Sequence, residues 1–173
     1  VAADFGHGIF TEAGAQAIAE RCDFLVLMVQ SNASNWGFNI LTKWPRCDYF
    51  VTDEPELRLA FRARTAPIET LLGTMRQQMG ARIGAVTRGH HGCLIMDESG
   101  TFACPALASK VVDRMGAGDA FLGATAGLAQ VGAPKEVIAL VGSVAAGIKV
   151  GLMGNERGVT RRETEQWLKS LLA

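Results

Sequence analysis

The pattern of apolar and polar residues predicts strands that alternate with helices along the chain. Residues 24–29 are continuously apolar, as expected of a strand covered on both faces, and residues 47–52 and 82–87 predict two further strands. Residues 67–79 instead carry apolar residues at helical spacing. Strands that alternate with helices in this way predict an α/β domain with a mainly parallel sheet.

Local signals place the remaining elements. The chain opens in a short apolar run that ends at Asp4 before a glycine turn, which predicts a strand. Thr11, Asp53 and Thr160 each stand where a helix is expected to begin, because their side chains can cap first-turn N–H groups. Further elements are expected at residues 93–97 (a strand before a hairpin turn), 111–112 (a short strand), 117–130 and 134–150 (two helices).

The composition favours one domain that acts on a small molecule. Hydrophobic residues make up 49% of the 173, which is enough to bury a core. The 17 basic and 17 acidic residues cancel and do not gather in one stretch, so no surface for nucleic acid or an anionic membrane is indicated. We therefore expect a small-molecule ligand, with neither nucleic acid nor membrane as a partner.

The cysteines and the apolar runs bear on the cellular compartment. The four cysteines lie far apart, without the Cys and His spacing of a structural zinc site. No apolar run reaches the roughly 18 uninterrupted residues of a membrane helix, and the first residues lack the layout of a signal peptide. These features lead us to expect a protein of the reducing cytoplasm.

Two glycines and two aspartates lie together at residues 113–119. Gly116 and Gly118 permit positive φ and let a ligand approach the backbone closely, while the first turn of the helix that follows leaves N–H groups unpaired and suits an anion. Asp119 lies in that turn, where it could accept a proton from an attacking hydroxyl, as phosphoryl transfer requires. The alternative is a plain turn in which Asp119 only caps the helix.

Residues 113–121, Asp-Arg-Met-Gly-Ala-Gly-Asp-Ala-Phe, closely resemble the C-terminal signature of the pfkB (ribokinase-like) carbohydrate kinases, usually Asp-Thr-Thr-Gly-Ala-Gly-Asp-x-Phe. Arg114 and Met115 replace the two threonines. The resemblance runs over nearly the whole chain but covers only the C-terminal part of the family's fold. It implies that residues 1–173 form a three-layer, Rossmann-like α/β domain that lacks the family's N-terminal part and lid.

The resemblance also implies an activity, that of an ATP-dependent sugar kinase. The γ-phosphate of ATP, bound with Mg²⁺, would pass to a hydroxyl of a sugar or sugar phosphate. Asp119 would be the base, and the amides of Gly116, Ala117 and Gly118 would form the anion hole.

Residues 86–92, Val-Thr-Arg-Gly-His-His-Gly, are similar to the family's Val-Thr-x-Gly-x-x-Gly segment. This implies that Thr87, Gly89 and Gly92 bind the nucleotide, together with Gly118. The spacing by itself predicts an ordinary hairpin.

Residues 53–56, Asp-Glu-Pro-Glu, stand where the family has Asn-x-x-Glu, a pair that helps to order magnesium and phosphate. The resemblance implies that Glu56 and Asp53 hold magnesium through water, although Asp53 adds a carboxylate and a plain helix cap is the alternative. Asp113 corresponds to a family residue that binds a monovalent cation such as K⁺, with further carbonyls from residues 151–155. The alternative for Asp113 is a surface or capping aspartate.

Residues 4–8 and 145–154 look most like the kinase domain of bifunctional ADP-heptose synthases, which points to a heptose phosphate as substrate. Arg114, Met115 and Asp53 depart from the family pattern and keep open a nucleotide- or sugar-binding module without turnover, or an inactive fragment of a kinase. Asp119 argues against that alternative, because a dead site would be free to lose its base.

Family members carry an N-terminal segment with further strands, most sugar contacts and a lid, and the sequence has no counterpart before Val1. We therefore expect the chain to be the C-terminal part of a longer kinase, with an open edge on its first strand. Because an open edge can pair with another chain, we also expect a homo-oligomer.

Overall fold

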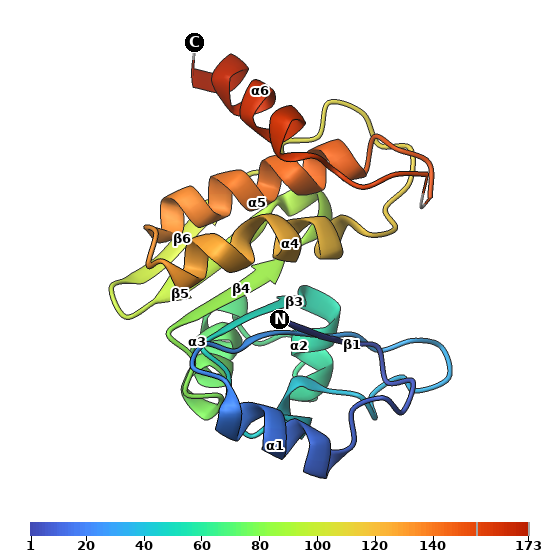
Figure 1. The fold of residues 1–173 in the computed structure, drawn as a ribbon, viewed down its shortest axis with the longest axis vertical. Coiled ribbons are helices and arrows are strands. Elements are labelled where there is room, and N and C mark those ends of the chain that lie inside the picture. The colour runs from blue at the N-terminus through green and yellow to red at the C-terminus, as the bar shows by residue number, and fades with distance from the viewer. Residues whose placement is uncertain (155, 173) are drawn as a thin grey trace. The chain divides into compact units, whose positions relative to one another are not determined.

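The computed structural model describes residues 1–154 and 156–172 (Figure 1). The chain divides into two compact units: unit 1 comprises residues 1–87 and 95–101, and unit 2 comprises residues 88–94 and 102–173. The described strands form a six-stranded sheet in the order β1-β2-β3-β4-β5-β6. The pairs β1–β2, β2–β3 and β3–β4 are all parallel, so the predicted mainly parallel sheet is confirmed.

Unit 1 has the alternating order that the apolar pattern predicts. The Thr11 side chain accepts the N–H of Gly14, and Asp53 caps α2, whose first turn contains a proline. These signals begin two of the expected helices. The elements are β1 (Ala2–Asp4), α1 (Glu12–Arg21), β2 (Val26–Val29), a 3₁₀ turn (Leu41–Lys43), β3 (Tyr49–Asp53), α2 (Glu54–Ala60), α3 (Ile68–Gln78) and β4 (Ile83–Thr87).

The strand register of unit 1 brings polar residues to one edge. Asp4 pairs in register with Val29, and Asp53 pairs with Thr87. These residues end their strands, and carboxyl ends of parallel strands lie on the same side of a sheet, where ligands commonly bind. All four residues of β2 are buried, as its continuous apolar run predicts.

The described part of unit 2 contains three α-helices and parts of two strands. The strands are β5 (Cys93–Asp97) and β6 (Gly100–Cys104), and the helices are α4 (Ala117–Gln130), α5 (Lys135–Lys149) and α6 (Arg161–Leu172). Helices α4 and α5 run side by side (Figure 1). Their close approach needs Gly142, because a Cβ there would lie 2.5 Å from the Phe121 ring.

The strand expected at residues 111–112 is wrong. Val111 and Val112 are exposed and have no strand geometry. The Val150 carbonyl, just beyond α5, accepts the N–H groups of Val112 at 2.7 Å and Asp113 at 3.1 Å. Because these amides bond to a helix end rather than a neighbouring strand, β propensity does not decide this segment.

Helix α6 begins after Thr160, the predicted cap, which forms a capping box with Glu163. The Thr160 N–H donates to Glu163 Oε2 at 3.0 Å, and the Glu163 N–H donates to Thr160 Oγ1 at 3.3 Å. Across residues 1–154 and 156–172, no helix has both the length and the apolar character needed to cross a bilayer.

Candidate functional site

The glycine turn before α4 has the geometry that an anion-binding site needs. Gly116 has φ +76° and stands at the N-cap of α4, whereas Gly118 lies inside the helix. The sequence allowed positive φ at both glycines, and only Gly116 adopts it. The Ala117 N–H makes a long 3.4 Å bond to the Arg114 carbonyl, while the Gly118 N–H belongs to the first turn, which has no intrahelical acceptor.

Asp119 lies in that first turn and is exposed. Its Oδ2 is 3.9 Å from the point that a Cβ on Gly116 would occupy. The carboxylate therefore lies beside the turn, and no side-chain hydrogen bond caps α4 at Gly116. A carboxylate here is stabilised by the positive end of the helix dipole.

Asp113 connects the turn to the segment that follows α5. Its Oδ1 accepts the Met115 N–H at 3.0 Å, and its Oδ2 accepts the Gly154 N–H at 2.9 Å. The Met115 N–H, followed by the Gly154 N–H and the charge of Lys149, holds the Asp113 pKa below its ordinary value. Both carboxylate oxygens are thus engaged by backbone amides.

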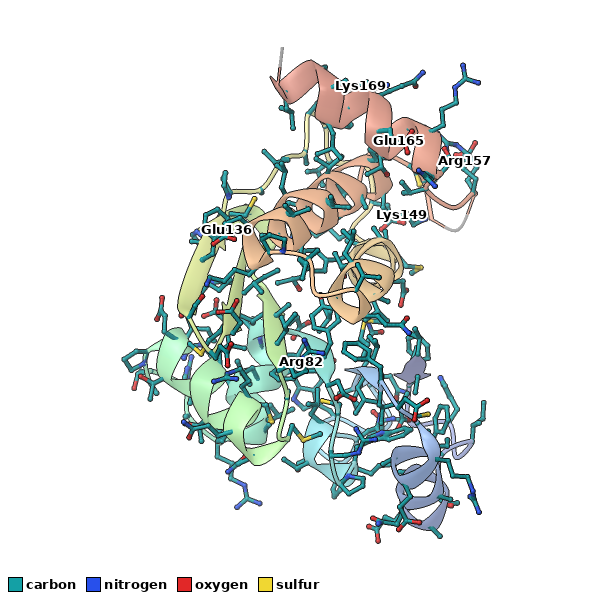
Figure 2. All side chains as sticks on the ribbon, turned by 60° about the vertical axis from the view of Figure 1, so that its left-hand side comes forward. Arg82, Glu136, Lys149, Arg157, Glu165 and Lys169 are labelled. Carbon is teal, nitrogen blue, oxygen red and sulfur yellow. The ribbon has the colours of Figure 1, made fainter. Side chains whose placement is uncertain are left out.

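Lys149 is a buried cation that the sequence analysis missed. It ends α5, is only 6% exposed, and donates from Nζ to the carbonyls of Gly154 at 2.6 Å and Arg157 at 3.5 Å. Figure 2 labels Lys149 and Arg157 in this part of unit 2. A single charged residue among the small and apolar residues 144–151 was the available signal.

Glu56 and Asp53 form a carboxylate pair at the end of β3 in unit 1. Asp53 Oδ1 accepts the Glu56 N–H at 2.7 Å. Glu56 Oε1 accepts the Ser31 N–H at 2.9 Å, and Thr52 Oγ1 lies 3.5 Å from Glu56 Oε2. Ser31, in the loop after β2, is a second residue that the sequence analysis did not single out.

The carboxylate pair has the electrostatics of a site that favours a cation. Burial, together with the nearby Asp53 charge, raises the Glu56 pKa to about 7. Loss of solvation likewise raises the Asp53 pKa, although the hydrogen bond from the Glu56 N–H lowers it. Because two neighbouring carboxylates repel each other, a divalent cation would stabilise the charged form of both.

The residues expected to bind a nucleotide are placed by β4 and the turn after it. Thr87 ends β4, opposite Asp53 in the register, and its Oγ1 lies 3.5 Å from the Thr52 carbonyl. Gly89, with φ +57°, begins a short 3₁₀ turn. Gly92, with φ +81°, lies so close to residues 104–106 that a Cβ would come within 2.0 Å of the Cys104 carbonyl oxygen.

A buried network surrounds Asp4 at the end of β1. Asp4 is 2% exposed and pairs with Lys43 Nζ at 2.7 Å, and it also accepts the Trp44 ring N–H at 3.1 Å. Asn39 Nδ2 donates to the carbonyls of Asp4 and Gln30, both at 3.0 Å. Burial by itself would raise the Asp4 pKa, but the Lys43 pair and the hydrogen bonds outweigh it and hold the pKa low.

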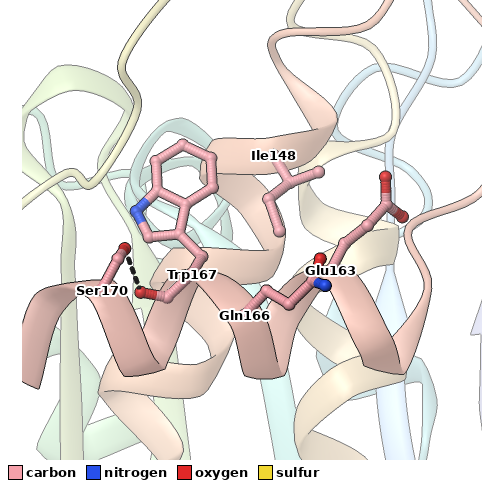
Figure 3. A pocket seen from close by; sticks show the side chains of 5 residues that line it. All are labelled: Ile148, Glu163, Gln166, Trp167 and Ser170. Carbon is pink, nitrogen blue, oxygen red and sulfur yellow. Dashed lines mark hydrogen bonds between the residues drawn. The ribbon is translucent and has the colours of Figure 1, made fainter.

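A shallow pocket of about 410 Å³ lies between α5 and α6 (Figure 3). Its lining includes none of the catalytic, nucleotide-binding or metal-binding residues predicted from sequence. The hydroxyl of Ser170, one of its lining residues, donates to the Trp167 carbonyl at 2.7 Å. The lining residues are Ile148, Glu163, Gln166, Trp167 and Ser170.

The structure brings the predicted residues together in two groups. Unit 1 places Asp53 beside Glu56 and Thr87, and unit 2 gathers Asp113, Asp119 and the Gly116 turn around Lys149. Asn155, at the end of the segment expected to supply carbonyls, lies outside the described residues. Among the described residues, no cluster of three or more His, Cys, Asp or Glu side chains could hold a metal ion. Magnesium would therefore need water and ligand phosphates as further ligands.

A family model and two known proteins match the sequence of this chain. The family model for pfkB family carbohydrate kinases matches residues 9–160. Bifunctional protein HldE of Methylobacillus flagellatus is 40% identical over 87 residues, which are 50% of this chain and 17% of that protein. The 2-dehydro-3-deoxygalactonokinase of Haloferax volcanii is 28% identical over 126 residues, which are 73% of this chain and 39% of that protein. The chain thus spans well under half the length of either relative.

Solved structures of similar fold include sugar kinases. The ribokinase of Thermotoga maritima has TM-score 0.70 and 23% identity, over 90% of this chain and 52% of that one. Phosphofructokinase-2 of Escherichia coli, in complex with potassium, has TM-score 0.75 and 17% identity, over 94% and 52%. The Arabidopsis thaliana ribokinase complexed with ribose and ATP has TM-score 0.74 and 21% identity, over 91% and 51%. The fold is therefore ribokinase-like, and the chain corresponds to about half of each of these proteins.

Proposed function

Because the chain belongs to the pfkB family of carbohydrate kinases, we propose that residues 1–173 are the nucleotide-binding and catalytic part of an ATP-dependent sugar kinase. The observation that carries the proposal is the Gly116 turn, with first-turn amides of α4 next to the Asp119 carboxylate. This combination pairs an anion site with a base. Phosphoryl transfer depends on positioning and charge stabilisation of this kind.

In the proposed reaction, Asp119 accepts the proton of a sugar hydroxyl. The hydroxyl oxygen forms a bond to the γ-phosphorus of ATP, and the bond from that phosphorus to the bridging oxygen breaks, so that ADP leaves. The amides of Gly116, Ala117 and Gly118 stabilise the negative charge of the transferring group. The proposed nucleotide-binding residues are Thr87, Gly89 and Gly92, on the resemblance of residues 86–92 to the family segment, and Gly118, on that of residues 113–121.

Asp53 and Glu56 fit a magnesium ion held through water, because one carboxyl repels the other and Glu56 is fixed by the Ser31 N–H. Bound magnesium would neutralise charge on the phosphates. The residues around Asp113 fit a monovalent cation less well than Asp53 and Glu56 fit magnesium. The reason is that Lys149 already donates to the carbonyl of Gly154.

The proposed acceptor is a heptose phosphate. The support is the 40% identity to the bifunctional HldE protein over half of the chain, together with the similarity of residues 4–8 and 145–154 to that class of kinase domain. The second candidate is a nucleotide- or sugar-binding module without turnover. Arg114 and Met115 favour it, because both stand where the family has threonine.

The test is phosphoryl transfer by the full-length protein. It is incubated with ATP and a heptose phosphate, with ribose as the comparison acceptor, in magnesium or in excess chelator. We expect ADP and a new phosphate ester in equal amounts. Transfer should need magnesium, because the site offers carboxylates and amides, and a metal ion would have to neutralise the charge of the ATP phosphates. ATP binding without any ester, with either acceptor, would support the binding module instead. Transfer that survives the chelator would contradict the assigned metal role.

A further inference from the structure

The segment after α5 is bound by the Lys149 side chain, at the position where the family resemblance implies a monovalent cation. Residues 151–155 are the stretch whose carbonyls would serve a monovalent cation, with Asp113 as the charged ligand. Here the Lys149 Nζ donates to the Gly154 carbonyl at 2.6 Å and to the Arg157 carbonyl at 3.5 Å. An ammonium group thus already binds a carbonyl oxygen in this stretch.

Lys149 also lies against the glycine turn. A Cβ on Gly116 would be 2.8 Å from Lys149 Cε and 3.7 Å from its Nζ. The same point lies 3.9 Å from Asp119 Oδ2. The end of the Lys149 side chain and the Asp119 carboxylate therefore both lie against the Gly116 turn, whose amides would bind the transferring phosphate.

Asp113 completes the arrangement from the other side. It bonds the Met115 N–H, next to the Gly116 turn, and the Gly154 N–H, whose residue also gives its carbonyl to Lys149. One peptide segment at Gly154 is consequently held by an anion at its N–H and a cation at its carbonyl. Two chain segments more than thirty residues apart are fixed together by this pair of charges.

Lys149 could instead be an ordinary cation at a helix C-terminus, where lysine is favourable. Its hydrogen bonds indicate a further role, because they reach the carbonyls of Gly154 and Arg157, beyond the end of the helix. Burial of the side chain to 6% exposure also differs from a solvated surface lysine. The ammonium is a compact charge with three donors, so it can bind several oxygens as a small cation does.

We propose that Lys149 is a tethered cation that takes the place of a monovalent metal ion, so that the Gly116 turn is organised without potassium. This inference rests on the proposed function for its catalytic consequence: Lys149 is a positioning residue for the anion hole, and transfer needs no K⁺. The Escherichia coli phosphofructokinase-2 of similar fold, which was solved in complex with potassium, is a suitable comparison protein.

The test measures hydrogen–deuterium exchange of residues 111–121 in the full-length protein, in potassium chloride and in choline chloride at equal ionic strength. We expect the wild type to exchange equally in the two salts. Lys149→Met keeps the apolar stem and removes the charge, and it should speed exchange in choline by about tenfold or more, with potassium restoring protection. Lys135→Met, at the other end of α5 and also at a buried lysine, is the control and should not respond to the choice of salt.

Two results would overturn the inference. One is potassium-specific protection or thallium(I) binding in the wild type, which would mean that a metal ion binds despite Lys149. The other is Lys149→Met exchange that is equally fast in both salts, which would reduce Lys149 to a helix-end contact. If Lys149→Met does not fold, the test rests on the exchange of the wild type in potassium chloride compared with choline chloride. Exchange needs no turnover, so a failure of the kinase assay in both salts would count against the proposed function and leave this result standing.

Discussion

Glu56 Oε1 accepts the backbone N–H of Ser31 at 2.9 Å, across 25 residues of sequence. The bond ties the first turn of α2 to the loop that follows β2, and so fixes a carboxylate next to Asp53. This hydrogen bond lowers the Glu56 pKa, but burial and the Asp53 charge outweigh it and raise the pKa to about 7. The site is thus built at a cost in stability that a bound cation would relieve.

The first prediction concerns the pH dependence of stability at Glu56. Its pKa is about 7 in the folded protein against an ordinary value of 4.5, so the charged form is disfavoured by folding. The cost in folding stability of charging Glu56 is absent below pH 4.5, grows as pH rises toward about 7, and is complete above that pH. Glu56→Gln should therefore raise the unfolding free energy by about 1–3 kcal/mol near pH 8, with the gain fading in acid.

The matched control is Glu54→Gln on the same helix, where Glu54 pairs with Arg58 at 2.8 Å. Denaturant unfolding at several pH values should show no such gain for this variant. Magnesium should stabilise the wild type at alkaline pH and leave Glu56→Gln unchanged. Equal stability of wild type and Glu56→Gln at every pH would show that burial does not penalise this carboxylate.

The second prediction is that Asp119→Asn abolishes most turnover. The amide keeps the shape of the carboxylate but cannot accept the hydroxyl proton, so kcat should fall about a hundredfold or more while ATP affinity changes little. Glu136→Gln, at an exposed acid in the first turn of α5, is the control. Steady-state kinetics of the full-length protein check this, and an unchanged kcat would return Asp119 to a capping role.

The third prediction concerns the Lys43–Asp4 pair. Lys43→Met leaves a carboxylate of 2% exposure without its cation, so we expect a loss of about 3 kcal/mol at neutral pH. The Asp4 pKa is held low in the wild type, so the pair stabilises the fold above the ordinary pKa and loses its effect in acid. The loss should shrink as pH falls, and Asp4→Asn with Lys43→Met should recover part of it. A loss that is constant with pH would rule out an unpaired charge as its cause.

The fourth prediction is self-association through β1. Of the described strands, only β2 neighbours β1 in the sheet, so the other edge of β1 offers unpaired backbone groups. We expect the isolated residues 1–173 to form a dimer in sedimentation at micromolar concentration. Ala3→Lys places a charge on this strand and should shift the protein toward monomer, whereas Ala13→Lys, on the exposed side of α1, should not. A wild type that sediments as a monomer would contradict the prediction.

Elements with local causes could be predicted from the sequence. Thr11, Asp53 and Thr160 each begin a helix by accepting the N–H group three residues further along the chain. The apolar run of β2 reports burial directly. The Gly116 turn was also predictable, because positive φ before a helix is a property of the glycine itself.

Contacts between segments distant in sequence depend on tertiary packing and could not be predicted. The valines at 111–112 suggested a strand, but their fate depends on the Val150 carbonyl beyond α5. Ser31 serves Glu56, and Lys149 serves Gly154 and the Gly116 turn, through the packing of separate loops and helix ends. Hydrogen bonds and charges act over a few ångströms, and the chain's spacing in sequence does not encode which distant groups come within that range.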